Sequence, residues 1–252
     1  MSARARHWLF LASAPVLAVL LLIALAKLPG FGRYPGPYGD LINSVAVDER
    51  HVTNAVTAVN FDYRGLDTLG EEYILFTAVV GVMLLLREQR AGRARPVIAA
   101  EGREVHERSD AVQWFGLGFA GVLIVFGIYV VLHASLTPGG GFQGGAILGT
   151  ASLFIFLAMG HRVFVRVTPK WLVEVAKSGG AGGYALIGVA SMLAGAAFLQ
   201  NVLPLGETRA LLSGGTIFLI NVAVGLEVSA GFAMLALEFL EEISAGAPED
   251  SR

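Results

Sequence analysis

Glu227 and Glu71 are the residues whose type and position most directly predict chemistry. Glu227 separates the uncharged stretches 210–226 and 228–237. Glu71 lies just before the uncharged stretch 73–86, whose 14 residues give only about 21 Å of helix. Because a helix needs about 20 residues to cross a bilayer, this helix should begin near Asp67, with Glu71 and Glu72 about one turn inside the membrane boundary.

A carboxylate at membrane depth is unfavourable unless it binds a proton, a cation or a basic partner, so Glu71 and Glu227 are ion-path candidates. Two alternatives stay open. Glu71 and Glu72 could lie at headgroup level, facing water, and Glu227 could be buried passively against another protein of a complex. Lys177 and Glu174, near the start of a later apolar stretch, are interpreted as interfacial anchors.

The acidic and basic residues before Glu71 form a compact loop motif. Arg64 can pair with Asp62 or Asp67 in an ion-paired turn, and Asp67 or Thr68 can cap the following helix. Glu71 then lies in the first turn, where the helix dipole favours negative charge. The functional interpretation makes Asp67 a further ion-path candidate beside Glu71.

A glycine-rich motif interrupts the long uncharged stretch 111–161. It lacks the Lys-Ser/Thr of a phosphate-binding loop, so close helix packing is expected, with the amides at the helix start facing a wet cavity. His133, five residues earlier, is either a hydrogen-bonded interface residue or a proton relay. The motif consists of Pro138, Gly139, Gly140, Gly141, Phe142, Gln143, Gly144 and Gly145.

The residue inventory argues against a hydrolase. The chain has no cysteine and no His-Glu-x-x-His motif. Its aspartates do not occur as the intramembrane pair of an aspartyl protease. We therefore expect no hydrolase site, no metal site and no cofactor.

The distribution of charge predicts the elements that hold these residues. Charged residues make up 15% of the 252 residues and hydrophobic ones 55%, which is typical of a polytopic membrane protein. We expect an all-α integral membrane protein with about six transmembrane helices. Their predicted ranges are 8–28, 67–87, 111–133, 142–161, 177–200 and 213–239.

Basic residues orient these helices. Thirteen of the 18 lysines and arginines fall in segments that would share one side, against five on the other, so both termini should be cytoplasmic. The first apolar run also has features of a cleaved signal peptide, an alternative that leaves the other helices unchanged. The long outer loop after it should carry an amphipathic helix. That helix is capped by Asp40, with Leu41, Val45, Val52, Val56 and Val59 at helical spacing.

The chain divides into two hydrophobic blocks joined by a charged linker. The predicted segments are a two-helix module over 1–88, a cytoplasmic linker over 89–110, a four-helix module over 111–243 and a polar tail over 244–252.

These motifs resemble a known transporter family. Residues 108–243, with the glycine motif and Asn221–Val228, resemble the MnhB component of the Mrp (Mnh) multisubunit Na⁺/H⁺ antiporters. Residues 1–88, with the loop motif that runs from Asp62 to Glu71 and includes Gly70, resemble the C-terminal end of the large MnhA component. They also resemble a small component of membrane-bound hydrogenases. The chain departs from the family pattern at Asn221, where aspartate is common, and at Glu227, where the family lacks an acid.

The resemblance implies an accessory component of a prokaryotic inner-membrane antiporter. Its partners would be the other Mrp-type subunits (A, C, D, E, F and G), and Na⁺ and H⁺ would be the transported ions. The alternatives are a structural scaffold without a role in the ion path, and an ion-translocating module of a membrane-bound hydrogenase-type complex.

Overall fold

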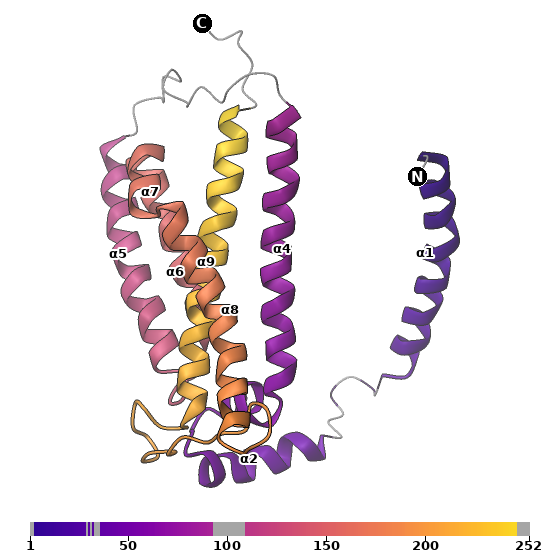
Figure 1. Ribbon diagram of the computed structural model, residues 1–252, viewed down its shortest axis with the longest axis vertical. Coiled ribbons are helices and arrows are strands. Elements are labelled where there is room, and N and C mark those ends of the chain that lie inside the picture. The colour runs from indigo at the N-terminus through magenta and orange to yellow at the C-terminus, as the bar shows by residue number, and fades with distance from the viewer. Residues whose placement is uncertain (1–2, 29, 31, 33–35, 93–108, 246–252) are drawn as a thin grey trace, which may run out of the picture. The chain divides into compact units, whose positions relative to one another are not determined.

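The computed structural model describes residues 3–28, 30, 32, 36–92 and 109–245, and within these ranges the chain is helical, without strands (Figure 1). The predicted all-α class is therefore confirmed. The helices are α1 (Ala3–Ala26), α2 (Pro37–Arg50), α3 (Ala55–Ala58), a π-helical turn (Val59–Tyr63), α4 (Gly65–Gly92), α5 (Asp110–Leu132), α6 (Gly141–Met159), α7 (His161–Val167), α8 (Lys170–Leu193) and α9 (Thr216–Ala245).

The chain forms two compact units, Met1–Leu41 and Ile42–Arg252. The first unit holds α1, an apolar helix with Pro15 inside it. None of its span His7–Ala26 is buried within the described chain. A helix that is apolar on all sides is suited to lipid or to the helices of other proteins.

In the described residues, five helices are long and apolar enough to cross a membrane. These spans are His7–Ala26, Gly65–Leu86, Asp110–Leu132, Gly141–Met159 and Thr216–Leu240. The sixth predicted helix exists as α8, which follows Pro169 and carries charges in its first turns. Its predicted end at residue 200 is wrong, because Gly195 adopts a left-handed φ of 81° just after the helix ends at Leu193.

The outer-loop helix is shorter than the predicted pattern. It begins at Pro37 and ends at Arg50, because His51 has a left-handed φ of 56°. Val52 is buried beyond this break, and Val56 belongs to the separate helix α3. The apolar spacing from Leu41 to Val59 is therefore divided among α2, α3 and the start of the π-helical turn rather than carried by one helix.

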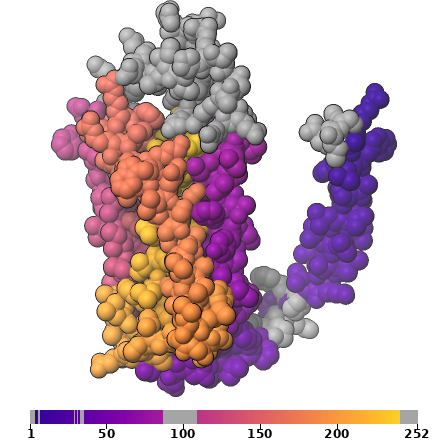
Figure 2. All heavy atoms as spheres, in the orientation of Figure 1, coloured from indigo at the N-terminus to yellow at the C-terminus, as the bar shows by residue number. Residues whose placement is uncertain are grey.

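Within the unit Ile42–Arg252, α9 is the central helix and packs against α4, α5, α6 and α8. In the space-filling view, α4 and α8 lie side by side and leave only parts of α9 visible (Figure 2). The C-terminal ends of α4 and α9, the start of α5, and α7 share one end of the bundle, opposite the segment 194–215 (Figure 1). The cytoplasmic location of that end remains a prediction.

Two buried apolar clusters occupy successive levels of the bundle. The first includes Phe61, Leu69, Tyr184 and Val228. The second includes Val79, Phe164, Val173, Met234 and Leu237. Leu75 on α4 packs against both clusters, so their boundary lies near this residue and, on α9, just after Val228. The linker and tail predicted at 89–110 and 244–252 fall largely outside the described residues.

Candidate ion site and its supporting contacts

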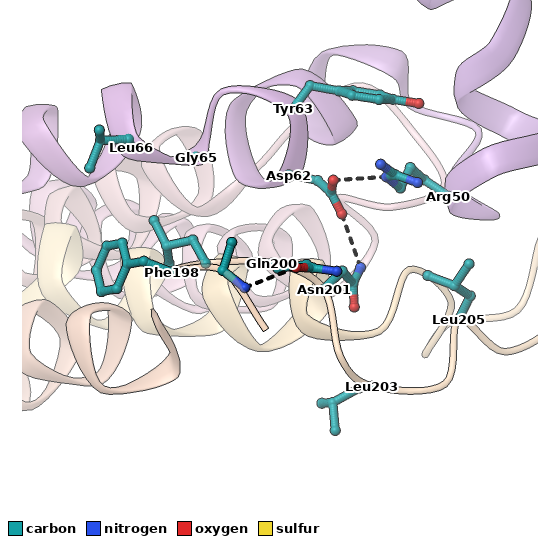
Figure 3. A pocket seen from close by; sticks show the side chains of 12 residues that line it. Arg50, Asp62, Tyr63, Gly65, Leu66, Phe198, Gln200, Asn201, Leu203 and Leu205 are labelled. Carbon is teal, nitrogen blue, oxygen red and sulfur yellow. Dashed lines mark hydrogen bonds and ion pairs between the residues drawn. The ribbon is translucent and has the colours of Figure 1, made fainter. Parts of the chain in front are cut away.

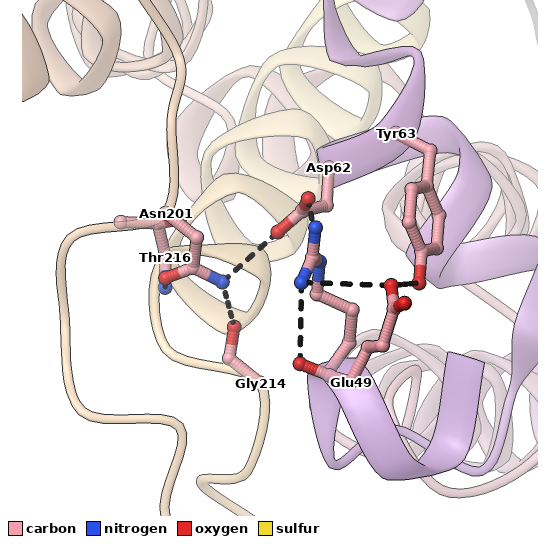
Figure 4. Close-up of polar contacts among 7 residues, drawn as sticks. Glu49, Asp62, Tyr63, Asn201, Gly214 and Thr216 are labelled. Atoms are coloured by element: carbon pink, nitrogen blue, oxygen red, sulfur yellow. Dashed lines mark hydrogen bonds and ion pairs between the residues drawn. The ribbon is translucent and has the colours of Figure 1, made fainter. Parts of the chain in front are cut away.

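The loop motif is anchored at the end of the bundle where α9 begins. Asp62 accepts hydrogen bonds from Arg50 Nε at 2.8 Å and from Asn201 Nδ2 at 3.1 Å (Figure 4). Asn201 also donates to Gly214 O at 2.8 Å and accepts from the Thr216 amide at 3.0 Å. The start of α9 is thus fixed to the loop before α4.

Tyr63 strengthens this connection from the other side. Its hydroxyl donates to Glu49 at 2.6 Å, and the Arg50 guanidinium lies 4.7 Å from the centre of its ring (Figure 4). Burial, aided by the hydrogen bond to Glu49, raises the pKa of Tyr63 to about 12. The phenol therefore remains protonated well above neutral pH.

A cavity of about 750 Å³ opens beside this network (Figure 3). Arg50, Asp62 and Asn201 line its polar side, and Phe198 and Leu203 its apolar side. Both Asp62 oxygens already accept hydrogen bonds from the chain, so the network is complete without a ligand.

The turn before α3, at Thr53 and Asn54, is also hydrogen-bonded to the loop before α6. Thr53 Oγ1 donates to Leu136 O at 2.7 Å, and Asn54 Nδ2 donates to Ala134 O at 2.9 Å and Thr137 O at 3.0 Å. Because buried carbonyl groups need donors, Thr53 and Asn54 hold the turn that leads into the glycine motif. The two predicted modules are therefore joined by hydrogen bonds.

The glycine motif lets α6 lie against both α5 and α9. A Cβ at Gly145 would stand 2.7 Å from the Val228 Cβ, and one at Gly141 would stand 2.6 Å from Asn221 O. At Gly144 the obstacle is the Gly127 O, at 2.8 Å. Side chains at these positions would force the helices apart.

Other residues of the motif complete the packing. Phe142 packs against the first apolar cluster, Pro138 is exposed, and Gly140 is buried. The Gly141 amide does not face a wet cavity as expected, because it is buried and donates to Asn221 Oδ1 at 3.0 Å. Gly139 has a φ of 150°, and a Cβ there would lie 2.9 Å from Val130.

Two carboxyl groups meet in the interior of the bundle. Glu72 on α4 and Glu227 on α9 are both fully buried and lie within hydrogen-bonding reach of one another. None of their four oxygens accepts a hydrogen bond from a donor among the described residues. A bond between the two groups therefore requires that one of them carry a proton.

Lys177 on α8 is the nearest basic group to this pair. It is 4% exposed, its ammonium lies 4.7 Å from the centre of the Phe76 ring and 3.8 Å from Met83 Sδ, and it interacts electrostatically with Glu227. Its interpretation as an interfacial anchor is wrong. Because α8 begins at Lys170 rather than at 177, Lys177 lies two turns inside the helix.

Further polar groups lie along the same helices on either side of the pair. Thr68, one turn before Glu72, is buried beside Tyr184, whose hydroxyl donates to Gly65 O at 2.7 Å. Toward the other end, Lys170 pairs with the buried Glu238, about 16 Å along α9 from Glu227.

The predicted site residues do not all come together. Glu71 and Gly70 are exposed on the outer side of α4, and Asp67 pairs there with Arg64 through a 2.7 Å hydrogen bond. Asp67 lies in the first turn of α4, which begins at Gly65 rather than after an Asp67 or Thr68 cap. Of the predicted acids, Glu227 alone is buried against another carboxyl group.

His133 also lies away from the pair. It caps the end of α5, where its ring stacks on Tyr129 at 4.1 Å and Nδ1 lies 3.1 Å from Tyr129 O. Glu72 was not among the predicted ion-path candidates, and Lys177 was predicted as an anchor instead. Glu72 lies at helical spacing with Thr68, Phe76 and Val79, on the inward face of α4.

The chain is similar to known proteins over the segments that hold these residues. A protein-family model described as a domain related to the MnhB subunit of Na⁺/H⁺ antiporter matches residues 115–234, which include the glycine motif and Glu227. An uncharacterized protein of Methanocaldococcus jannaschii is 30% identical over 216 residues, covering 77% of this chain and 80% of the relative.

Two solved complexes contain chains of similar structure. One is the membrane-bound sulfane sulfur reductase, an archaeal respiratory membrane complex, with 30% identity, a TM-score of 0.66, and coverage of 94% of this chain and 98% of that chain. The other is the Mrp complex from Dietzia sp. DQ12-45-1b, with 23% identity and a TM-score of 0.67. That match covers 100% of this chain but 27% of the other, and it shows a shared fold. The chain therefore belongs to the Mrp/Mnh-type family of antiporter-related membrane subunits.

Proposed function

We propose that this chain is an accessory membrane component of a multisubunit monovalent-cation/proton antiporter in a prokaryotic inner membrane. The carrying observation is that the segment matching the MnhB-related domain holds both the close-packed glycine motif and the buried Glu227. The first feature suits a protein that fixes helix positions, and the second suits one that contributes a group able to bind ions. Such a protein is a transporter component and not an enzyme.

Its partners would be the other subunits of an Mrp-type complex, and Na⁺ and H⁺ the transported ions. Glu71 supports contact with such partners, because it is exposed on this chain within Gly65–Leu86, a span long and apolar enough to cross a membrane. An exposed carboxylate there is stabilised by a neighbouring protein or a hydrated route. Asp67, one turn away on the same side, would lie at the mouth of that route.

The direct test of membership in the complex is purification. The tagged full-length chain, extracted from native membranes in mild detergent, should bring down the other antiporter subunits in fixed proportion. Recovery with redox-enzyme subunits instead would refute the antiporter assignment.

A test of the role in transport uses paired variants. Glu71→Gln and Glu227→Gln should lower cation/proton exchange in everted vesicles while leaving the complex assembled. Gly145→Val should prevent assembly, because even an added Cβ would stand 2.7 Å from Val228 Cβ. Unchanged exchange in both glutamine variants would support a scaffold without a role in the ion path.

A second candidate is an ion-translocating module of a membrane-bound oxidoreductase. It is favoured by the match to the sulfane sulfur reductase complex, which has the higher sequence identity of the two and covers nearly all of that chain. The genes beside this one separate the two candidates, since they would encode either antiporter subunits or redox subunits.

A further inference from the structure

The buried carboxyl pair belongs entirely to this chain. Glu72 comes from α4 and Glu227 from α9, whereas Glu71 lies on the outer side of α4. We propose that Glu72 and Glu227 form an internal proton-binding site, in which the two carboxyl groups share one exchangeable proton and Lys177 balances the remaining negative charge. The use of this proton in transport rests on the proposed function, but the existence of the site does not.

Apolar residues of the described bundle enclose the pair and keep it out of contact with water. Along α4 and α9, Leu69 and Val224 of the first apolar cluster precede the pair, and Val79 and Met234 of the second follow it. Gly180 closes the site from α8, because a Cβ there would stand 2.6 Å from the Glu227 amide nitrogen. Both carboxyl groups are consequently fully buried.

Charge balance predicts a proton at this position. Two ionised carboxylates in one closed site repel each other and lose their hydration. Lys177 interacts with Glu227 and can offset one negative charge. Glu174 also acts on Lys177, but its side chain is exposed. Glu71 is the other charge acting on Glu72 and is negative as well. The second carboxyl is therefore best accommodated with a proton shared across the pair.

The ligand set favours a proton over a metal cation. Hard cations draw several oxygen ligands, whereas the described residues contain no group of three or more histidines, cysteines, aspartates and glutamates suited to a metal. The neighbouring hydroxyl of Tyr184 is already donated to Gly65 O. Two carboxyl groups and an ammonium group are sufficient to bind one proton and balance the charge.

Infrared spectroscopy of the purified complex tests the site directly. A protonated carboxyl group absorbs in a separate carbonyl-stretch region, and an exchangeable one shifts in deuterated water. The wild-type complex at neutral pH should show such a band. Glu72→Gln should abolish it, because the remaining Glu227 would ionise and pair with Lys177. Glu227→Gln should keep the band but shift it, because an amide replaces the accepting carboxylate.

Glu71→Gln is the matched control, since it changes the adjacent acid on the outer side of the same helix and should leave the band unchanged. Lys177→Met is a second variant, which removes the balancing charge and should increase the absorption toward two protonated carboxyl groups. Persistence of the band in Glu72→Gln, or its loss in Glu71→Gln, overturns the proposal. So does a wild-type band that is absent in sodium buffer and present in choline buffer, because a cation would then occupy the pair.

The same preparation separates this proposal from the proposed function. Reconstituted complex that shows the predicted band but exchanges no cation for protons retains the site and refutes the antiporter. Complex that exchanges cations without the band refutes the proton site alone.

Discussion

Substituting Gly180 by alanine tests how closely α8 must approach α9. The new Cβ would stand 2.6 Å from both Ala223 O and the Glu227 amide nitrogen. Ordinary contact begins at 3.4 Å, so the two backbones must separate by about 0.8 Å or distort. Overpacking of this kind destabilises a fold by about 1 to 3 kcal/mol.

The same helix supplies matched controls. Gly179 and Gly182 lie within two residues of Gly180, and a Cβ at either would meet nothing within 4 Å. Alanine in place of glycine within a helix is favoured by up to about 1 kcal/mol. Gly179→Ala and Gly182→Ala should therefore match or exceed the wild type, and Gly180→Ala should fall about 1 to 3 kcal/mol below them.

The assay is equilibrium unfolding of the full chain in mixed detergent micelles, followed by loss of helical circular dichroism. All three variants carry the same glycine-to-alanine change, so their comparison removes the propensity gain. Equal stability of Gly180→Ala and its two controls would refute the close packing of α8 on α9. A selective loss at Gly182 would show that α8 is rotated from the described orientation.

Two further predictions concern the polar contacts. Asn221→Leu should lower the free energy of unfolding by about 1 to 3 kcal/mol, because the buried Gly141 amide loses its acceptor; the same micelle assay measures it, and a neutral result contradicts the contact. Tyr63→Phe should remove an absorbance transition centred near pH 12 from the ultraviolet tyrosine titration. Because this pKa is raised above 10, the contribution of Tyr63 to stability is complete below pH 10 and is lost as the pH rises through about 12. If the transition lost in Tyr63→Phe is instead centred near pH 10, the raised pKa of Tyr63 is contradicted.

Much of the helical architecture could be predicted because charge separates apolar helices from their connections. The glycine motif likewise indicated close packing, since glycine is the one residue that lets helix backbones meet at positions such as Gly141 and Gly145. The ends of α2 and α8 were predicted less accurately. They depend on the left-handed conformations of His51 and Gly195, and histidine is not a typical helix-ending residue.

The choice between Glu71 and Glu72 was beyond the sequence pattern. Both faces of α4 are largely apolar, so periodicity does not indicate which one packs against α9. Contacts between residues distant in sequence identify the inward face of α4. Val79 packs in the same cluster as Met234, and Leu69 packs in the same cluster as Val228. Lys177 was misplaced for a related reason, because its depth depends on where α8 begins.

In the proposed function, this chain is a working part of a cation/proton antiporter. The most direct measurement uses proteoliposomes containing the purified complex with and without this chain, with internal pH followed after a sodium gradient is imposed. Sodium-dependent proton movement should disappear without the chain and return when it is added back. Exchange of equal rate in both preparations, or none in the complete complex, would contradict it.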